Sequence, residues 1–107
     1  MGPVAVGSDR ITDLVQLLTD RSARLDERDD AAIDLGGFDD PRAIDALIDV
    51  GSAADEERGL AATCGESLAQ IASRDGGNAK QWLSLLAHDA AAEFRRSPDA
   101  MRPGLLD

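Results

Sequence analysis

The sequence contains few aromatic residues, one cysteine and one histidine. Its aromatic residues are Phe38, Trp82 and Phe94, and it has no tyrosine. Alanine, leucine and isoleucine must therefore supply most of the packing, which suits closely stacked helices better than aromatic-rich strands. The single cysteine, Cys64, excludes an intramolecular disulfide and a four-cysteine zinc site. A catalytic cysteine–histidine pair would have to join Cys64 to His88, and their spacing does not support it.

Long apolar stretches are also missing, so no segment is predicted to span a membrane. The first ten residues lack the apolar core of a signal peptide, and we expect a cytoplasmic protein. The 107 residues hold 21 acidic and 11 basic side chains, a net charge of −10. This excess argues against binding the phosphates of nucleic acid and against binding an anionic membrane surface.

The pattern of apolar residues, glycines and prolines predicts one all-α domain over residues 9–97, between a flexible arm at 1–8 and a tail at 98–107. Strand signals are absent. The first three helices are expected at about 9–19, 26–35 and 41–50, the third being opened by Asp40-Pro41 and stopped by Gly51. The fourth is expected to start at a Ser52/Asp55 capping box and run to about residue 73. A fifth helix follows Asn78, and a last helix ends by residue 97.

A repeat of 30 residues runs through this helical pattern. The motif Arg-x-x-Ala-Ala occupies residues 28–32 and 58–62, and His-x-x-Ala-Ala occupies residues 88–92. Between the first two copies, residues 40–48 read DPRAIDALI. These motifs resemble the HEAT-repeat family, including its short bacterial variety seen in phycobilisome lyases. The resemblance implies a short HEAT-like helical-repeat solenoid of five to six helices, which presents its second helices on a concave face that binds a partner.

Motifs for catalysis or for cofactor binding are not found. His88, Asp89 and Glu93 do not share one helix face, because a helical neighbour of His88 must lie three or four residues away. The carboxylates lack the calcium-loop spacing, and no phosphate loop or dinucleotide motif occurs. The sequence therefore predicts a protein that is not an enzyme and binds no cofactor or metal. The alternatives left open are an accessory protein related to the lyases or to chaperones, and a general scaffold adaptor.

The negative charge is concentrated in residues 26–66, here called the acidic segment. It holds 13 acidic and three basic residues, so it carries the whole net charge of −10. Solubility alone would account for any single acid, but it does not require neutral flanks beside so acidic a centre. A concentrated negative field would steer a basic protein partner toward the segment and speed its association.

These observations predict a protein-binding module with an acidic face, and most specifically an immunity protein that neutralises a cognate toxin such as a nuclease. A nuclease site is positively charged because it holds phosphates, and acidic side chains would fill it. The oligomeric state stays open. Trp82 is included as a possible aromatic anchor, although core packing is the preferred interpretation for that residue. The candidate partner-binding residues are Asp39, Asp40, Arg42, Asp45, Asp49 and Trp82.

Overall fold

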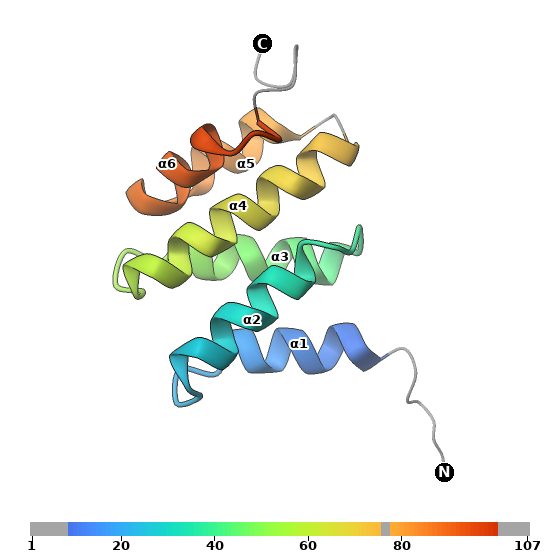
Figure 1. Cartoon of the computed structure of the whole chain (residues 1–107), viewed down its shortest axis with the longest axis vertical. Coiled ribbons are helices and arrows are strands. Elements are labelled where there is room, and N and C mark those ends of the chain that lie inside the picture. Colours follow the sequence, from blue (N-terminus) through green and yellow to red (C-terminus); the bar gives the residue numbers. More distant parts are fainter. Residues whose placement is uncertain (1–8, 76–77, 101–107) are drawn as a thin grey trace.

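A computed structural model describes residues 9–75 and 78–100, which form six helices and no strand (Figure 1). The predicted arm at 1–8 and residues 101–107 of the predicted tail lie outside this part. The all-α class and most of the expected helix positions are confirmed. The helices are α1 (Asp9–Thr19), α2 (Leu25–Leu35), α3 (Pro41–Gly51), α4 (Arg58–Asp75), α5 (Ala79–Leu85) and α6 (His88–Arg96).

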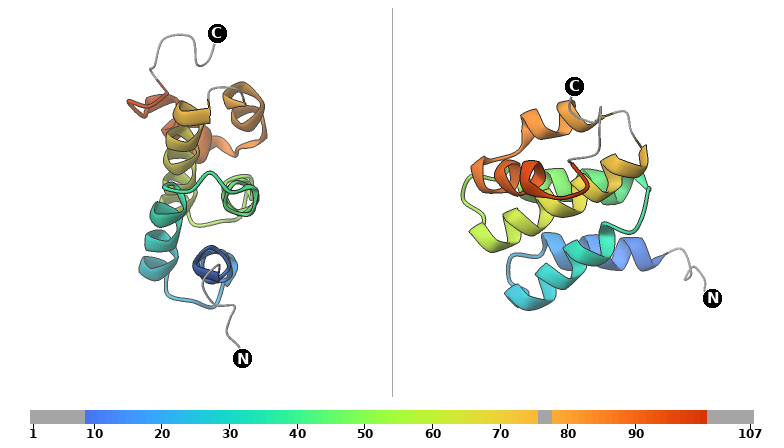
Figure 2. Two further views of the ribbon diagram at one scale, coloured as in Figure 1. Left: turned by 90° about the vertical axis from the view of Figure 1, so that its right-hand side faces the viewer. Right: turned by 45° about the horizontal axis from the view of Figure 1, so that its top comes forward.

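The helices form two layers. Figure 2 shows α1, α3 and α5 in one layer and α2, α4 and α6 in the other. Within the second layer α4 packs against both α2 and α6, and within the first α1 packs against α3. Contacts between α1 and α2 and between α3 and α4 join the layers. The body is elongated, with principal extents of 48 × 27 × 18 Å.

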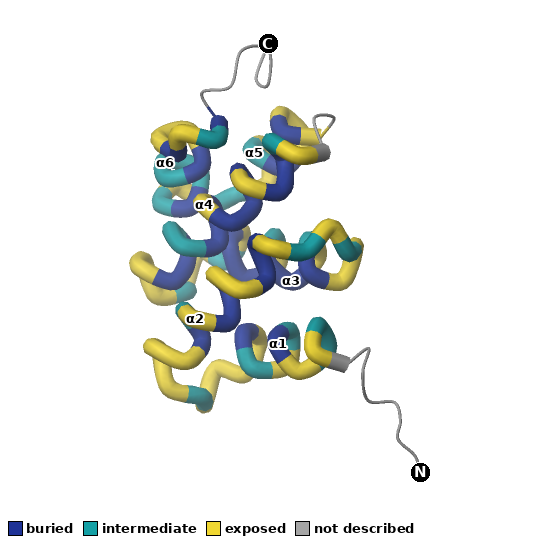
Figure 3. Tube along the Cα trace, turned by 45° about the vertical axis from the view of Figure 1, so that its right-hand side comes forward, coloured by how far each residue is buried: buried dark blue, intermediate teal, exposed yellow. Residues whose placement is uncertain are grey.

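Most of the buried hydrophobic residues are leucines and alanines. Figure 3 colours the buried positions of each helix dark blue. Ala31, Ala32 and Leu35 bury one face of α2, and the two alanines belong to the motif at residues 28–32. On α3 the fully buried leucine is Leu47, whereas Ile44 and Ile48 are only partly buried. Smaller residues form the rest of the buried face of α3. They fit here because the helix packs against both α1 and α4. They are Ala43, Ala46, Val50 and Gly51.

Helices α4 and α6 are in close contact at Gly65. A Cβ atom added to Gly65 would lie 2.0 Å from the carbonyl oxygen of Ala90 and 3.0 Å from its Cα atom. Only a residue without a side chain permits this approach of the two backbones. The contact seals Phe94 and Cys64, which have no exposed surface.

The predicted start of the fourth helix is wrong. Ser52 ends α3, and α4 begins only at Arg58. The carboxylate of Asp55 accepts hydrogen bonds from the distant Arg21 instead of capping a helix. The Glu57 side chain accepts a hydrogen bond from the backbone N–H of Gly59 at 3.3 Å, so this glutamate satisfies a donor in the first turn of α4.

The boundary of the C-terminal tail also differs from the prediction. The Ala100 N–H donates to the Ser97 carbonyl oxygen at 3.0 Å, and both residues are buried. Residues 98–100 therefore form a turn against the helices, although Pro98 suggested a departure from regular structure at this point.

Candidate functional site

The start of α3 positions two of the predicted partner-binding residues, Asp40 and Arg42. Asp40 is the N-cap, and its Oδ1 atom accepts from the Arg42 N–H at 2.8 Å, while Pro41 takes the first helical position. The Arg42 guanidinium donates two hydrogen bonds to the Asp40 carboxylate, at 2.9 and 3.1 Å, and a third to the Thr12 hydroxyl on α1. The side-chain hydrogen bond from Arg42, followed by its backbone N–H, lowers the pKa of Asp40. Asp40 and Arg42 therefore serve the helix start and its attachment to α1.

Asp39 is separated from the other candidates. It lies before α3, where Arg74 at the end of α4 pairs with it at 2.9 Å. The same guanidinium donates to the Gly36 carbonyl oxygen at 2.8 Å, which satisfies the C-terminal end of α2. Asp39 therefore belongs to a connection between α2 and α4, at the opposite end of α3 from Asp49.

Asp45 and Asp49 are exposed on successive turns of α3. They line a groove of about 460 Å³ between α1 and α3, together with Val15, Thr19, Arg42 and Ala46. In the described residues neither carboxylate forms an ion pair. The groove between α1 and α3 thus combines an apolar floor with two carboxylates that form no ion pair in the described residues. After Asp55 and Glu56, the charge of Asp49 also contributes to raising the pKa of the nearby Arg21.

Trp82 is placed in the core. It lies on α5 with 7% of its surface exposed, packed in the same cluster as the buried leucines. The preferred interpretation of this residue, core packing, describes its position, and it offers no exposed ring to a partner. It is therefore removed from the candidate surface.

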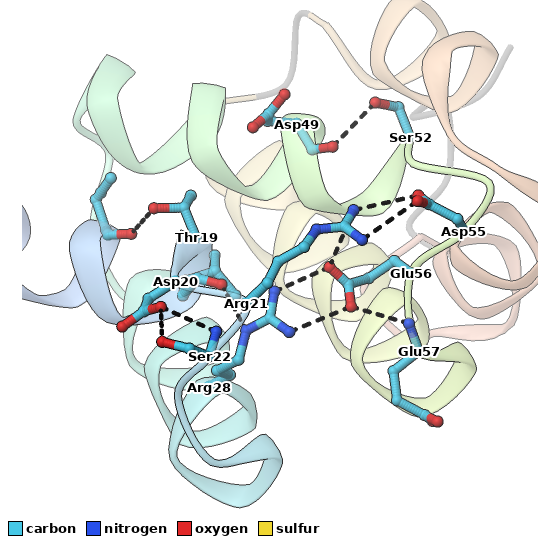
Figure 4. A network of polar contacts seen from close by, with 12 residues as sticks. Thr19, Asp20, Arg21, Ser22, Arg28, Asp49, Ser52, Asp55, Glu56 and Glu57 are labelled. Carbon is cyan, nitrogen blue, oxygen red and sulfur yellow. Dashed lines mark hydrogen bonds and ion pairs between the residues drawn. The ribbon is translucent and has the colours of Figure 1, made fainter.

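A network that the sequence did not reveal joins the loops α1–α2 and α3–α4 (Figure 4). Arg28 and Glu56 form a bidentate ion pair of 2.9 and 3.3 Å, and each side chain is 95% buried. Arg28 Nε also donates to the Leu18 carbonyl oxygen at 2.9 Å. Arg21 reaches Asp55 at 3.2 Å and Glu56 at 3.7 Å. Arg28 of the repeat motif on α2 therefore connects this helix to the end of α1 and to the α3–α4 loop.

Burial and pairing act in opposite directions on Glu56. Burial on its own raises the pKa of this carboxyl, but hydrogen bonds from Arg28 and from the Glu57 N–H outweigh it. With the charges of Arg28 and Arg21, they hold the pKa of Glu56 below its usual value. Nearby, the hydrogen bond and the charge of Arg21 lower the pKa of Asp55. Both carboxyls therefore stay ionised to lower pH than free side chains.

The fold brings arginines from outside the acidic segment onto its carboxylates. Four such ion pairs are Arg10–Asp34, Arg21–Asp55, Arg24–Asp26 and Arg74–Asp39. The remaining acids are also divided, because α2 and α3 lie in different layers (Figure 2). The expected single acidic face is therefore wrong as a description of the whole segment. Among the described residues of α3, the acids that form no ion pair are Asp45 and Asp49.

Sites of other kinds are weakly supported. The described residues contain no group of three histidine, cysteine or carboxylate side chains arranged to hold a metal ion. Cys64 is fully buried, and desolvation raises its pKa to about 12, so it is a poor nucleophile. His88 is exposed at the first position of α6. In the described part of the chain, no helix is both long and apolar enough to cross a membrane.

Comparisons with protein-family models, with curated proteins and with solved structures found no significant match. The functional assignment therefore depends on the geometry and chemistry of this chain. The groove between α1 and α3 is the candidate site, because it brings three of the predicted residues together: Arg42, Asp45 and Asp49.

Proposed function

We propose that this chain is a non-catalytic protein-binding module that holds a basic segment of a partner protein in the groove between α1 and α3. In its most specific form the proposal is an immunity protein that occupies the phosphate-binding site of a cognate toxin such as a nuclease. The observation that carries it is the pair of exposed, unpaired carboxylates of Asp45 and Asp49 beside the apolar Val15 and Ala46.

The position of these two acids has a local cost to the helix. Like charges at i and i+4 destabilise a helix by about 0.2–0.5 kcal/mol. Asp49 also lies in the last turn of α3, where the helix dipole disfavours negative charge and where no basic residue is present. In the part of the chain that the structure describes, neither carboxylate forms an ion pair, so a cation from a partner would offset this cost.

The groove suits arginine and lysine side chains in particular. Both have an apolar stem and a charged end, so the stem can lie on Val15 and Ala46 while the end meets a carboxylate. Arginine adds planar, bidentate geometry toward a carboxylate. Uncompensated charge at the rim would also raise the rate of encounter with a basic partner.

The arrangement of the helices supports a HEAT-like module. The repeated motif at 28–32, 58–62 and 88–92 falls on α2, α4 and α6, which share one layer. Helices α1, α3 and α5 form the other layer, and the groove lies between α1 and α3. On this interpretation the stack presents the helices of one layer to its partner, as solenoids of helix pairs do.

The test is affinity capture from native lysate at low and at high salt, followed by calorimetry with the captured protein. Capture of a basic protein that is lost at high salt is expected. Asp45→Lys combined with Asp49→Lys should weaken binding by about 100-fold or more, since it places like charges against the partner. If the partner is a toxin, its activity should be blocked by the wild-type chain and not by this variant.

A matched control separates the groove from overall charge. Asp30→Lys with Asp34→Lys changes the charge equally on exposed turns of α2, and it removes only the exposed pair of Asp34 with Arg10, which contributes little to stability. This variant should keep most of the affinity. Equal weakening by both variants, or unchanged affinity with the α3 variant, would remove the groove from consideration.

A further inference from the structure

A second groove lies in the other layer, between the N-terminal halves of α2 and α4. Its volume is about 510 Å³, and its lining is mostly apolar. The residues that line it are Leu25, Asp26, Asp29, Gly59, Leu60 and Thr63. Because α2 and α3 lie in different layers, this groove is distinct from the one that holds Asp45 and Asp49 (Figure 2).

Gly59 lines the groove and contributes no side chain to it. A Cβ atom added there would meet only the Glu57 Oε1 atom, at 3.9 Å, so the position opens onto free space. Leu60 is fully buried and forms the floor, whereas Leu25 is 45% exposed and forms a wall. An exposed leucine beside an open glycine leaves apolar surface that a partner side chain would cover.

Polar groups inside this groove already have partners. The Thr63 hydroxyl lies 2.6 Å from Asp29 Oδ1 and 3.0 Å from the Gly59 carbonyl oxygen. An apolar side chain can therefore enter without leaving a buried donor unsatisfied. The inner surface thus selects an aliphatic group over a polar one.

The rim of this groove is acidic. Its carboxylates come from Asp26, Asp29 and Glu57. Two arginines, Arg24 and Arg58, lie close to these acids in the sequence. Arg24 pairs with Asp26 at 2.8 Å, and Arg58 pairs with Asp89 of α6 at 3.4 Å. The rim is negative because its three carboxylates outnumber the two arginines, and Arg58 is already paired with Asp89 of α6. A negative rim complements a basic segment.

We propose that the groove between α2 and α4 is a second docking surface, which takes an aliphatic side chain flanked by lysine or arginine from a protein partner. The proposal rests on the proposed function, since it assigns this second contact to the same kind of basic partner. An apolar anchor that enters a recess while charges meet at its rim is the usual arrangement of a strong contact point in an interface.

The probe is an amidated peptide with lysine and arginine residues on both sides of a central leucine, titrated into the ¹⁵N-labelled chain. The leucine peptide should shift the amide signals of Leu25, Gly59 and Thr63. A matched peptide with serine in place of leucine should bind this groove about tenfold more weakly or less, because burial of the leucine is lost.

Two variants at one position control the experiment. Gly59→Leu fills the open space and should abolish the shifts at Leu25 and Thr63, and its circular dichroism should match the wild type. Gly59→Ala adds only a methyl group and should keep most of the binding. The pair Asp45→Lys and Asp49→Lys should leave the leucine-dependent shifts in place.

The results distinguish this inference from the proposed function. If both peptides shift only the amides around Asp45 and Asp49, the second docking surface is wrong and the first stands. If the leucine peptide shifts only Leu25, Gly59 and Thr63, the second surface stands and the first falls. Shifts at these three residues that depend on protein concentration, with dimers in sedimentation, would assign the groove to a second copy of the chain and overturn the inference.

Discussion

Gly65 gives the sharpest test of the fold, because replacing it with alanine forces two helix backbones apart. The added Cβ would lie 2.0 Å from the Ala90 carbonyl oxygen and 2.8 Å from its carbonyl carbon. These are backbone atoms, so no side-chain rotation relieves the contact. Helix α6 would have to move by about 1 Å or more before the contact reached 3.0 Å, which real Cβ atoms essentially never cross.

The magnitude follows from two opposing effects. Alanine favours a helix interior over glycine by about 1 kcal/mol. Overpacking of a core costs about 1–3 kcal/mol, and the upper end applies here because α6 must shift as a unit and loosen the packing of Phe94. We expect Gly65→Ala to lower the free energy of unfolding by about 2 kcal/mol, equivalent to about 10 °C in melting temperature.

The assay is urea unfolding followed by circular dichroism and by the fluorescence of Trp82, which is buried on α5. Gly59→Ala is the matched control on the same helix, because its added methyl meets only the Glu57 side chain at 3.9 Å. That control should be as stable as the wild type or more stable by up to about 1 kcal/mol. A Gly65→Ala protein at least as stable as the wild type would refute the close contact between α4 and α6.

Three further outcomes are expected. Glu56→Ala should lower the free energy of unfolding by about 3 kcal/mol in urea titrations, because it leaves Arg28 buried without its counter-ion. The double variant Arg28→Met with Glu56→Leu should lose less free energy of unfolding than the sum of the two single changes. The pKa of Glu56 is lowered in the folded protein, so its contribution to the free energy of unfolding is complete above the unfolded pKa of about 4.3 and is lost as pH falls through the folded pKa. Below about pH 4.3, the melting temperature of the wild type should therefore fall more steeply with pH than that of Glu56→Gln. Equal slopes would contradict this. Cys64 is buried and its pKa is raised to about 12, so it should resist a thiol-reactive dye at pH 8 in the folded protein and react rapidly in urea. Fast labelling without denaturant would show that the core around Cys64 is accessible to solvent.

The positions of most helices could be predicted because their signals are local. Asp40 and Pro41 begin α3, and the glycines after Leu35 end α2. The burial of Ala31 and Ala32 follows from the repeat motif in the same way. These features depend on residues within one or two helical turns, which the printed sequence contains in order.

The charge arrangement could not be predicted, since it depends on pairs that are far apart in the chain. Arg21 and Arg28 meet Asp55 and Glu56 across about 30 residues. These two acids lie before the start of α4 at Arg58, and their pairing reduces the free charge of the acidic segment. The Arg-x-x-Ala-Ala motif was visible, but its arginine is buried at residue 28 and exposed at Arg58. Position in the stack, which no single copy of the motif encodes, decides between the two environments.

The most direct test of the central claim is a nuclear magnetic resonance map of the ¹⁵N-labelled chain with its captured basic partner. The groove between α1 and α3 predicts the largest amide changes at Val15, Thr19, Asp45, Ala46 and Asp49, and their loss at high salt. Unchanged signals at these five residues, with a partner bound elsewhere on the chain, would contradict the account.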